Sequence, residues 1–523
     1  MKAWTLIAVG LFCVPFAMAE EGDDPPLPAI FPELATETFE GGRRIDLHRV
    51  PLLGYAAPRQ ADGSRSLLLL TRRPRTVDPD EEEPVPERDV CDDPTTVETS
   101  LYRLDFDRAE PSLTLLRDDL PGDASSLDAL DVDGDGSEEV LLFRPGQVVV
   151  LGAPGGTLAA ADPEVLVDDH ELSRESLTPS VLRDGVTLDE PWLQVPGIGV
   201  TRFYRPAEGS VTWAVAAEVE VNVQAFRARD GFNLFSPPAE YLGRDNDGHL
   251  VFAGQVEVVD RRRLKVSLIR PEIGEVEECW ARLPEPEIPI RRLPLLLNGE
   301  PVLLVTTRPA EDFGLFDEQL LRIFPLERDR SRAGREPVVA FKARANLINS
   351  VLPQLLDVNA DGRQDLVLGY WKGFDLEHVA LDVHLQAADG SFPSKPRSTE
   401  LKVKDGSAFV LSYGSDIDGD GAPDLLLVAG GQVRVHRGTP EGRQRVEKRP
   451  GLTAPLGLAT FEPDGETLML VGPDGVVVTV AGEPVVPRAV DLDGDGRSEL
   501  LIARRGEDGE GSLSLVLFDP AGE

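Results

Sequence analysis

The chain of 523 residues is poor in aromatic residues, in cysteine and in basic charge. Aromatic residues make up only 6%, which is a small supply for a surface that stacks on sugar rings. Lys and Arg total 53 against 92 Asp and Glu, so the formal net charge is −39. Nucleic acids and anionic membranes attract basic surfaces, and we therefore expect no nucleic-acid partner.

Long hydrophobic runs are also missing after the N-terminus, where no stretch approaches the about 18 apolar residues of a spanning helix. We expect no transmembrane segment. At the N-terminus, Lys2 precedes an apolar run over residues 3–16, and Ala17-Met18-Ala19 supplies the small residues of a cleavage site. This pattern is typical of a secretory signal peptide. It predicts a signal at residues 1–19, cut after Ala19, and a secreted or periplasmic protein.

Two cysteines remain beyond this segment, Cys91 and Cys279. An exported chain meets an oxidising compartment, where the two thiols could form a disulfide. The sequence does not show whether they are close enough, so an intramolecular Cys91–Cys279 disulfide stays an open alternative. Two cysteines outside any CxxC motif do not make a structural zinc framework.

The remaining chain divides into a linker and a repeat region. Residues 20–42 are acidic and Pro-rich and are expected to be a linker, and residues 43–523 one repeat domain with a polar insertion at 72–99. Between frequent Gly and Pro, the apolar segments are four to six residues long, as in Val140–Phe143 and Leu425–Val428. Short apolar runs bounded by turn residues predict β-strands.

Four segments repeat one pattern: an acidic nine-residue loop, a short apolar strand and, in three of them, a glycine ten residues after the loop glycine. The four loops begin at Asp131, Asp357, Asp416 and Asp491, and weaker copies surround Asp62, Asp245, Asn298 and Asp464. From the loop near residue 62 to the loop near residue 420, successive loops are 52 to 73 residues apart, except for a gap of 112 residues between 135 and 247. Another copy could lie in that gap, around Asp184-Gly185.

A repeat made of short strands cannot bury its own faces, whereas copies stacked radially can. We therefore predict an all-β fold, a β-propeller of four-stranded blades. At about 60 to 70 residues per blade the chain holds seven blades, with eight as the alternative. We expect the ring to close by pairing of a strand near Arg44–Val50 with Ser512–Phe518. A linear solenoid is the structural alternative.

Side-chain oxygens fall at positions 1, 3, 5 and 9 of each full loop, and glycine at position 6 permits a sharp turn. Hard, mostly anionic oxygen ligands at this spacing suit Ca²⁺, so we predict about four structural calcium sites. We expect no metal in the weaker loops. The predicted side-chain ligands are Asp131, Asp133, Asp135 and Glu139; Asp357, Asn359, Asp361 and Asp365; Asp416, Asp418, Asp420 and Asp424; and Asp491, Asp493, Asp495 and Glu499. The position-7 carbonyls of Ser137, Arg363, Ala422 and Arg497 would complete the sites.

Two other interpretations of the loops fit less well. An EF-hand needs a bidentate Glu at position 12 between two helices, but position 12 is Leu142, Leu368, Leu427 or Ile502 and lies in a strand. Asp and Gly are also ordinary turn residues. Turns alone, however, do not require an acid at all four positions of four loops.

The segments resemble the FG-GAP/VCBS repeat of integrin α-subunit propellers and of many secreted bacterial proteins. Four clear and about four weaker copies, between residues 58 and 505, carry the resemblance. It implies a propeller whose blade loops hold Ca²⁺.

No linear motif of catalysis is present: none of the six histidines belongs to HExxH, and no nucleophile elbow or phosphate-binding loop occurs. The leading hypothesis is an exported, calcium-binding propeller that acts as a non-enzymatic, adhesion-type scaffold for an unknown protein or glycan ligand. One alternative is a secreted hydrolase or lyase with a pocket at the central channel. Another is a purely structural component of the cell envelope.

Overall fold

The computed structural model describes residues 33–518 apart from 75–96, 170–179, 183–191, 310–317, 456–467 and shorter gaps. This part of the chain is almost entirely β-strand, and its single helical element is the 3-10 turn η1 (Pro271–Ile273). The predicted all-β class is therefore confirmed. The expected signal peptide, Cys91 and most of the polar insertion lie outside the described residues.

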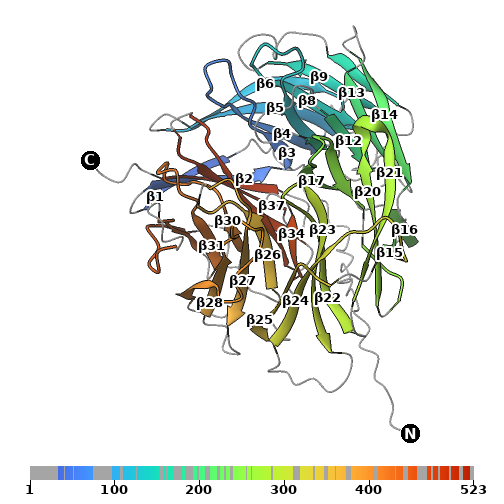
Figure 1. Ribbon diagram of the computed structural model, residues 1–523. Coiled ribbons are helices and arrows are strands. Elements are labelled where there is room, and N and C mark those ends of the chain that lie inside the picture. Colours follow the sequence, from blue (N-terminus) through green and yellow to red (C-terminus); the bar gives the residue numbers. More distant parts are fainter. Residues whose placement is uncertain are drawn as a thin grey trace, which may run out of the picture.

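The strands form eight blades arranged in a ring, which is a β-propeller (Figure 1). Blades 1 to 4 are built from residues 52–282. Blade 4 has five strands, and a separate two-stranded hairpin, β15 (Gln224–Ala228) and β16 (Gly231–Phe235), precedes it. The strands of these blades are β3 (Leu52–Ala56), β4 (Leu67–Pro74), β5 (Val97–Asp105) and β6 (Ser112–Leu120); β7 (Ser126–Leu130), β8 (Glu139–Arg144), β9 (Gln147–Gly152) and β10 (Glu164–Asp168); β11 (Ser180–Leu182), β12 (Trp192–Pro196), β13 (Val200–Pro206) and β14 (Trp213–Glu220); and β17 (Glu240–Arg244), β18 (Leu250–Ala253), β19 (Glu257–Val258), β20 (Arg263–Arg270) and β21 (Glu275–Arg282).

Blades 5 to 8 follow in the same order around the ring. The last sheet has seven strands, because strands from both ends of the described chain join it. The strands are β22 (Glu287–Leu297), β23 (Glu300–Pro309), β24 (Glu318–Pro325) and β25 (Val339–Asn346); β26 (Val351–Leu356), β27 (Asp365–Lys372), β28 (His378–His384) and β29 (Arg397–Lys402); β30 (Val410–Tyr413), β31 (Leu425–Ala429), β32 (Gln432–His436) and β33 (Leu452–Pro455); and β34 (Leu468–Gly472), β35 (Gly475–Val480), β36 (Glu483–Val490), β37 (Glu499–Arg505) and β38 (Gly511–Phe518), with β1 (Glu33–Phe39) and β2 (Gly42–Val50).

The blade count is eight, the larger of the two numbers that the sequence left open. The additional copy is blade 3, β11–β14, which fills the gap of 112 residues between the loops near 135 and 247. Residues 183–191, which include Asp184-Gly185, join its first strand to its second. The copy was hard to count from the sequence because this connection lacks the full acidic pattern.

The ring closes by antiparallel pairing of β2 with β38, in a register that runs from Gly42 opposite Phe518 to Val50 opposite Gly511. The predicted closure is confirmed, and it excludes the linear solenoid. Strand β1 pairs with β2 on the outer side, so the sheet begins within the segment 20–42 that was expected to be a linker. Leu34 and Phe39 pack against buried clusters, and this apolar contact explains why the end of that segment is ordered as a strand.

The core lies between neighbouring blades, and β4 shows how one strand serves two of them. Its four leucines, Leu67–Leu70, are at most 1% exposed. Alternate side chains of a strand point to opposite faces, so Leu68 and Leu70 pack with Leu142 of blade 2, whereas Leu67 and Leu69 pack with Leu515 of blade 8. Burial on both faces explains why such strands are continuous apolar runs rather than alternating ones.

Candidate metal-binding loops

The four acidic loops occupy equivalent places in their blades. In blades 2, 6 and 7 the loop joins the first strand of the blade to the second, and in the larger sheet of blade 8 it joins β36 to β37. We call this connection the first loop of the blade. The full loops are the first loops of blades 2, 6, 7 and 8. The weaker copies at Asp62, Asp245 and Asn298 are the first loops of blades 1, 4 and 5, and the copy at Asp464 lies outside the described residues. Equivalent connections lie at the same end of each blade, so the described loops share one face of the ring.

The glycine at position 6 has the backbone conformation that the turn requires. A positive φ is costly for any residue with a Cβ atom, which explains the glycine in this place. The φ angles are 90° at Gly136, 81° at Gly362, 83° at Gly421 and 86° at Gly496.

Two hydrogen bonds recur in all four loops and orient the acidic side chains. The carboxylate at position 1 accepts the N–H of the position-6 glycine, at 2.7–3.1 Å. The carboxylate at position 9 accepts the N–H of position 2, at 2.8–3.2 Å. The position-9 acceptors are Glu139, Asp365, Asp424 and Glu499, and their donors are Val132, Val358, Ile417 and Leu492.

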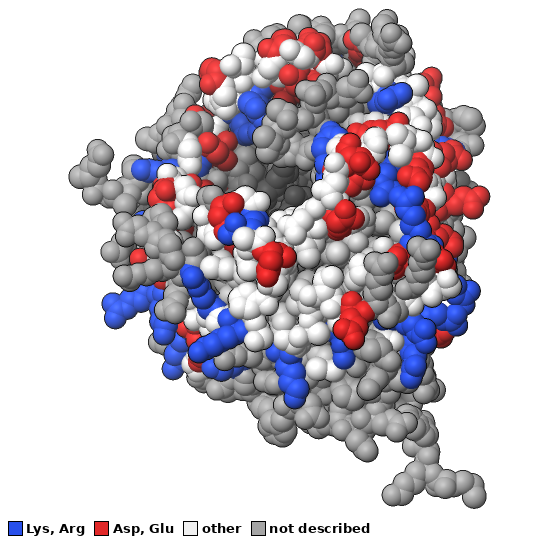
Figure 2. Space-filling model, viewed as in Figure 1, with Lys and Arg blue, Asp and Glu red and all other residues white. Residues whose placement is uncertain are grey.

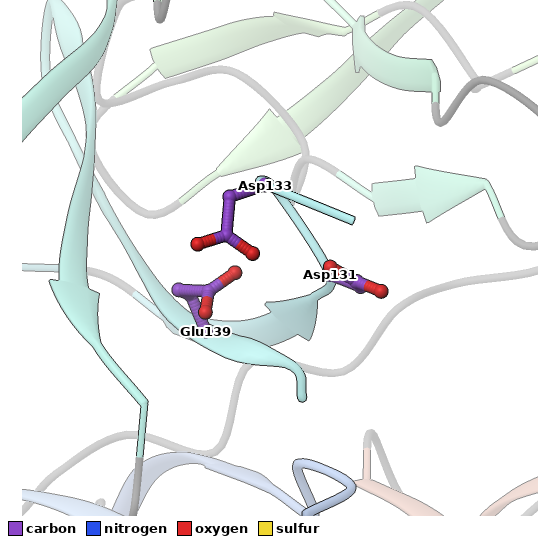
Figure 3. A group of neighbouring side chains, drawn as sticks. All are labelled: Asp131, Asp133 and Glu139. Carbon is purple, nitrogen blue, oxygen red and sulfur yellow. The ribbon is translucent and has the colours of Figure 1, made fainter. Parts of the chain in front are cut away.

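Two loops bring three carboxylates together. In blade 2, Asp131, Asp133 and Glu139 each offer an oxygen, and these oxygens lie within 4.8 Å of one another. Figure 3 shows Asp133 and Glu139 facing each other, with Asp131 beside them. Positions 1, 3 and 9 therefore converge in this loop. The same positions of blade 7, Asp416, Asp418 and Asp424, form a second such group.

The predicted ligand at position 5 is used differently in these two loops. Asp135 accepts the backbone N–H of Ser137 at 2.7 Å, and Asp420 accepts that of Ala422 at 2.8 Å. Neither side chain belongs to the converging groups. An Asp side chain readily accepts the N–H two residues ahead. Asp133 and Asp418 at position 3 also accept such a bond, at 3.1 and 3.3 Å, and still belong to the converging groups.

Crowding and burial leave the position-9 carboxylates hard to ionise. Burial, together with the charges of Asp133 and Asp131, raises the pKa of Glu139 to about 7. Burial likewise raises the pKa of Asp424 to about 6 and that of Glu499 to about 7. Clustered anionic oxygens of this kind fit a divalent cation, because its charge would offset both the burial and the mutual repulsion.

Blade 6 has Asn359 at position 3, so only Asp357 and Asp365 supply carboxylates at positions 1 and 9. The amide of Asn359 donates to Asp361 at 2.9 Å, and the convergence of positions 1, 3 and 9 in this loop stays a prediction. The guanidinium of Arg363 pairs with Asp361, and the Nε of Arg363 donates to the carbonyl of Gln386 at 3.1 Å. Arg363 thus holds Asp361 at the loop surface. Its position was predicted to supply a carbonyl ligand, and its side chain could not be placed from the sequence.

The loop of blade 8 is described only in part, because Asp495 lies outside the described residues. Asp491 and Glu499 make the same two backbone hydrogen bonds as their counterparts in the other loops. The loop of blade 8 therefore has the same two backbone hydrogen bonds as the other three full loops. Asp491, Asp493 and Glu499 are all described and do not form a converging group like those of blades 2 and 7, so their joint use as ligands stays a prediction.

Blade 4 contains a charge partner that the sequence did not reveal. Asp245, the first residue of its first loop, lies 2.8 Å from the Nε atom of Arg270, and both side chains are 8% exposed. Arg270 also contacts Glu275 and Glu277. The guanidinium supplies positive charge at a loop that lacks a full ligand set. Asp245 lies in a loop and Arg270, 25 positions further along the chain, lies at the end of β20, so no local pattern could have linked them.

The described cysteine and two of the histidines lie in the buried core. Cys279 is buried on β21, and its proposed partner Cys91 lies outside the described residues. His384 and His436 are buried, and their Nδ1 atoms lie 2.8 and 2.9 Å from backbone carbonyls.

Within the described ranges, no helix is long and apolar enough to cross a membrane. Figure 2 shows a hollow near the centre of the viewed face, with acidic and basic side chains around it.

No protein-family model matches the sequence, and no curated protein sequence is similar to it. Among solved structures, the chain is similar to the WD40 domain of SCAP from fission yeast, with 12% identity, coverage of 81% of this chain and 92% of that one, and a TM-score of 0.38. It is also similar to BBS1N in complex with ARL6DN, with 10% identity, coverage of 76% and 93%, and a TM-score of 0.33. A third is oligogalacturonate lyase in complex with manganese, with 10% identity, coverage of 91% and 98%, and a TM-score of 0.32. At these identities and scores, the three structures assign no function to this chain.

Proposed function

We propose that this protein is an exported, calcium-stabilised β-propeller of the FG-GAP/VCBS type that serves as a binding scaffold for a protein or glycan. The observation that carries the calcium part is the convergence of three carboxylates in each of two first loops, of blades 2 and 7. Oxygen-only, anionic donor sets suit Ca²⁺ rather than softer metals. In these sites Asp131, Asp133 and Glu139, and their counterparts in blade 7, hold the ion.

The expected affinity assigns the ion a structural role. Extracellular modules bind Ca²⁺ with a Kd of about 0.1–1 mM. At about 1 mM calcium, each occupied loop then adds roughly 0.4–1.4 kcal/mol to the free energy of unfolding. Four such loops contribute a few kcal/mol, a useful share of the stability of a typical domain.

Calcium removal tests this proposal directly. Thermal melting of the whole protein is measured in about 1 mM CaCl₂, in excess chelator, and in MgCl₂ at the same concentration. We expect Tm to be a few degrees higher in calcium than in chelator. Magnesium should act much less, because it keeps its water shell and demands a tighter octahedral site. Identical melting curves in calcium and chelator would refute calcium binding.

The scaffold part is tested by ligand capture. The propeller has two broad faces, and the acidic loops share one of them, which leaves the rest of the surface for a partner. A glycan array probed with the labelled protein, and crosslinking to candidate surface proteins, separate the two ligand classes. Absence of binding in both would favour the purely structural envelope role instead.

A further inference from the structure

The first loops contact one another around the ring through equivalent positions. In the weaker loops, positions are counted back from the apolar run of the second strand, which begins at position 10. In blade 1 the apolar run begins at Leu67, which therefore corresponds to Val140 at position 10 of blade 2. Counting back from Leu67 places Arg59 at position 2 and Arg65 at position 8. The loops of blades 7, 8, 1 and 2 then lie in sequence across the joint where the ring closes.

One backbone hydrogen bond is repeated three times along this arc. The N–H of position 8 in each loop donates to the C=O of position 2 in the preceding blade. The bonds join Ser498 to Ile417 at 3.3 Å, Arg65 to Leu492 at 2.7 Å and Glu138 to Arg59 at 2.8 Å.

Side chains at position 8 reinforce two of these bonds. The hydroxyl of Ser498 donates to the carbonyl of Asp416 at 3.1 Å. The carboxylate of Glu138, whose side chain is 8% exposed, accepts the backbone N–H of Arg59 at 2.8 Å and lies 3.1 Å from the guanidinium of Arg65. Each contact joins a loop to its predecessor in the ring, so the arc is bonded continuously from blade 7 to blade 2.

The series of backbone hydrogen bonds between first loops ends at blade 7. Position 8 of that blade is Pro423, which has no N–H to donate. In the other arc, the described contacts between first loops use side chains: Asn246 donates to Glu300 at 2.8 Å, and the N–H of Asn298 donates to the side chain of Gln364 at 3.3 Å. The backbone arrangement is thus particular to the arc that spans the closure.

We propose that these bonds form a latch, defined by positions 2 and 8 of blades 7, 8, 1 and 2, that holds the ring closed at the loop face. It acts alongside the β2–β38 pairing. Because each loop is bonded to the next, the four loops open as one cooperative unit. A local opening at blade 8 therefore spreads to the loops of blades 1 and 2, which are distant in sequence.

The latch also connects to the acidic loops. The carboxylates of Asp424 and Glu499 hold the N–H groups of Ile417 and Leu492, whose carbonyls accept the latch bonds. A cation that orders these carboxylates would therefore also protect the first loop of blade 1, which has no full acidic set. This consequence, unlike the latch itself, rests on the proposed calcium function.

Hydrogen exchange of the whole protein, followed by mass spectrometry, tests the latch without any metal. Ser498→Pro removes the donor, and Pro423 shows that proline is accepted at position 8 of an equivalent loop. The control Ser498→Ala keeps the N–H and loses only the hydroxyl. In chelator we expect Ser498→Pro to speed exchange about fivefold over residues 57–66 and 131–139 as well as 491–499. Residues 239–250 of blade 4 should be unchanged.

Two outcomes would overturn the latch: faster exchange confined to the loops of blades 7 and 8, or equal effects of the proline and alanine variants. Arg65→Pro, with Arg65→Ala as its control, breaks the next bond and replaces Ser498→Pro if that variant does not fold.

Repeating the measurement in calcium reports separately on the metal. Wild-type protection of residues 57–66 should rise, and Arg65→Pro, which removes the bond to Leu492, should abolish the rise. If calcium has no effect on the wild type, the proposed function fails while the chelator experiment still decides the latch.

Discussion

At the scale of single residues, the carboxylate at position 9 has two tasks. Glu139 accepts the N–H of Val132 at 2.8 Å and so shapes its loop, and its burial raises its own pKa to about 7. Asp424 and Glu499 show the same combination in blades 7 and 8. Without a cation the raised pKa makes the charged form of such a carboxyl less favourable, whereas a bound cation would favour the charged form.

Glu139→Gln separates these two tasks. The amide oxygen can still accept the N–H of Val132, but the charge is lost. In excess chelator we expect the variant to be as stable as the wild type at neutral pH. In calcium it should lack the roughly 0.4–1.4 kcal/mol ascribed to one loop. Urea unfolding in both conditions measures this, with Asp247→Asn, in the first loop of blade 4, as a control without effect. A full calcium response in Glu139→Gln would contradict the ligand role.

Glu240, at the start of β17, predicts a pH dependence unrelated to metal. Burial raises its pKa from 4.5 to about 7. The folded protein then binds a proton more tightly than the unfolded chain, so the contribution of Glu240 is most favourable below pH 4.5 and is lost as the pH rises to about 7. Above that range the buried charge is a cost.

We therefore expect Glu240→Gln to match the wild type at about pH 5 and to be more stable at about pH 8, by an amount of the order of 1–3 kcal/mol. Urea unfolding at both pH values gives the difference. If the difference in free energy of unfolding between Glu240→Gln and the wild type is the same at both pH values, Glu240 titrates normally.

At the scale of elements, the short strands and the turns between them follow from local sequence. The apolar runs Leu67–Leu70 and Val140–Phe143 lie in β4 and β8, as the pattern predicts. The acidic first loops were also predictable, since glycine at position 6 and acids at positions 1 and 9 act within nine residues. The side chain of Arg363, which pairs with Asp361, was not, because its direction depends on the carbonyl of Gln386 in another connection.

Gly136→Ala tests the backbone requirement of these loops. Its φ is 90°, and a Cβ atom there would meet nothing within 4 Å, so the cost is conformational alone. We expect a loss of about 1–2 kcal/mol in the free energy of unfolding. Gly254→Ala is the matched control, because its Cβ would make ordinary contacts of 3.6 Å and its φ is not positive. Equal effects of the two substitutions would argue against the left-handed turn.

At the scale of the whole molecule, stability depends on faces buried between blades and on the joint between blades 8 and 1. Leu515 of β38 is fully buried, pairs with Ile45 across the joint, and packs with Leu67 and Leu69 of blade 1. One side chain thus connects the last strand, the N-terminal strand and the first complete blade.

Leu515→Ala should lower the free energy of unfolding by about 2–5 kcal/mol, because it leaves a cavity in a closely packed interface. Leu115→Ala, on a side chain that is 48% exposed, should change it by at most about 0.5 kcal/mol. Chemical denaturation of both variants makes the comparison. A small effect of Leu515→Ala would mean that the closure contributes little to the fold.

The sequence by itself determined what depends on neighbours along the chain: the strand class, the turn glycines, the acidic template and the pair of strands that closes the ring. Tertiary structure alone decided the number of blades, the pairing of Asp245 with Arg270 and the bonds between first loops. Blade 3 lacks the full acidic pattern, and Ser498 and Ile417 lie far apart along the chain. Such contacts arise only when blades pack side by side, where the partner of each group is set by the geometry of the ring and not by the residues beside it.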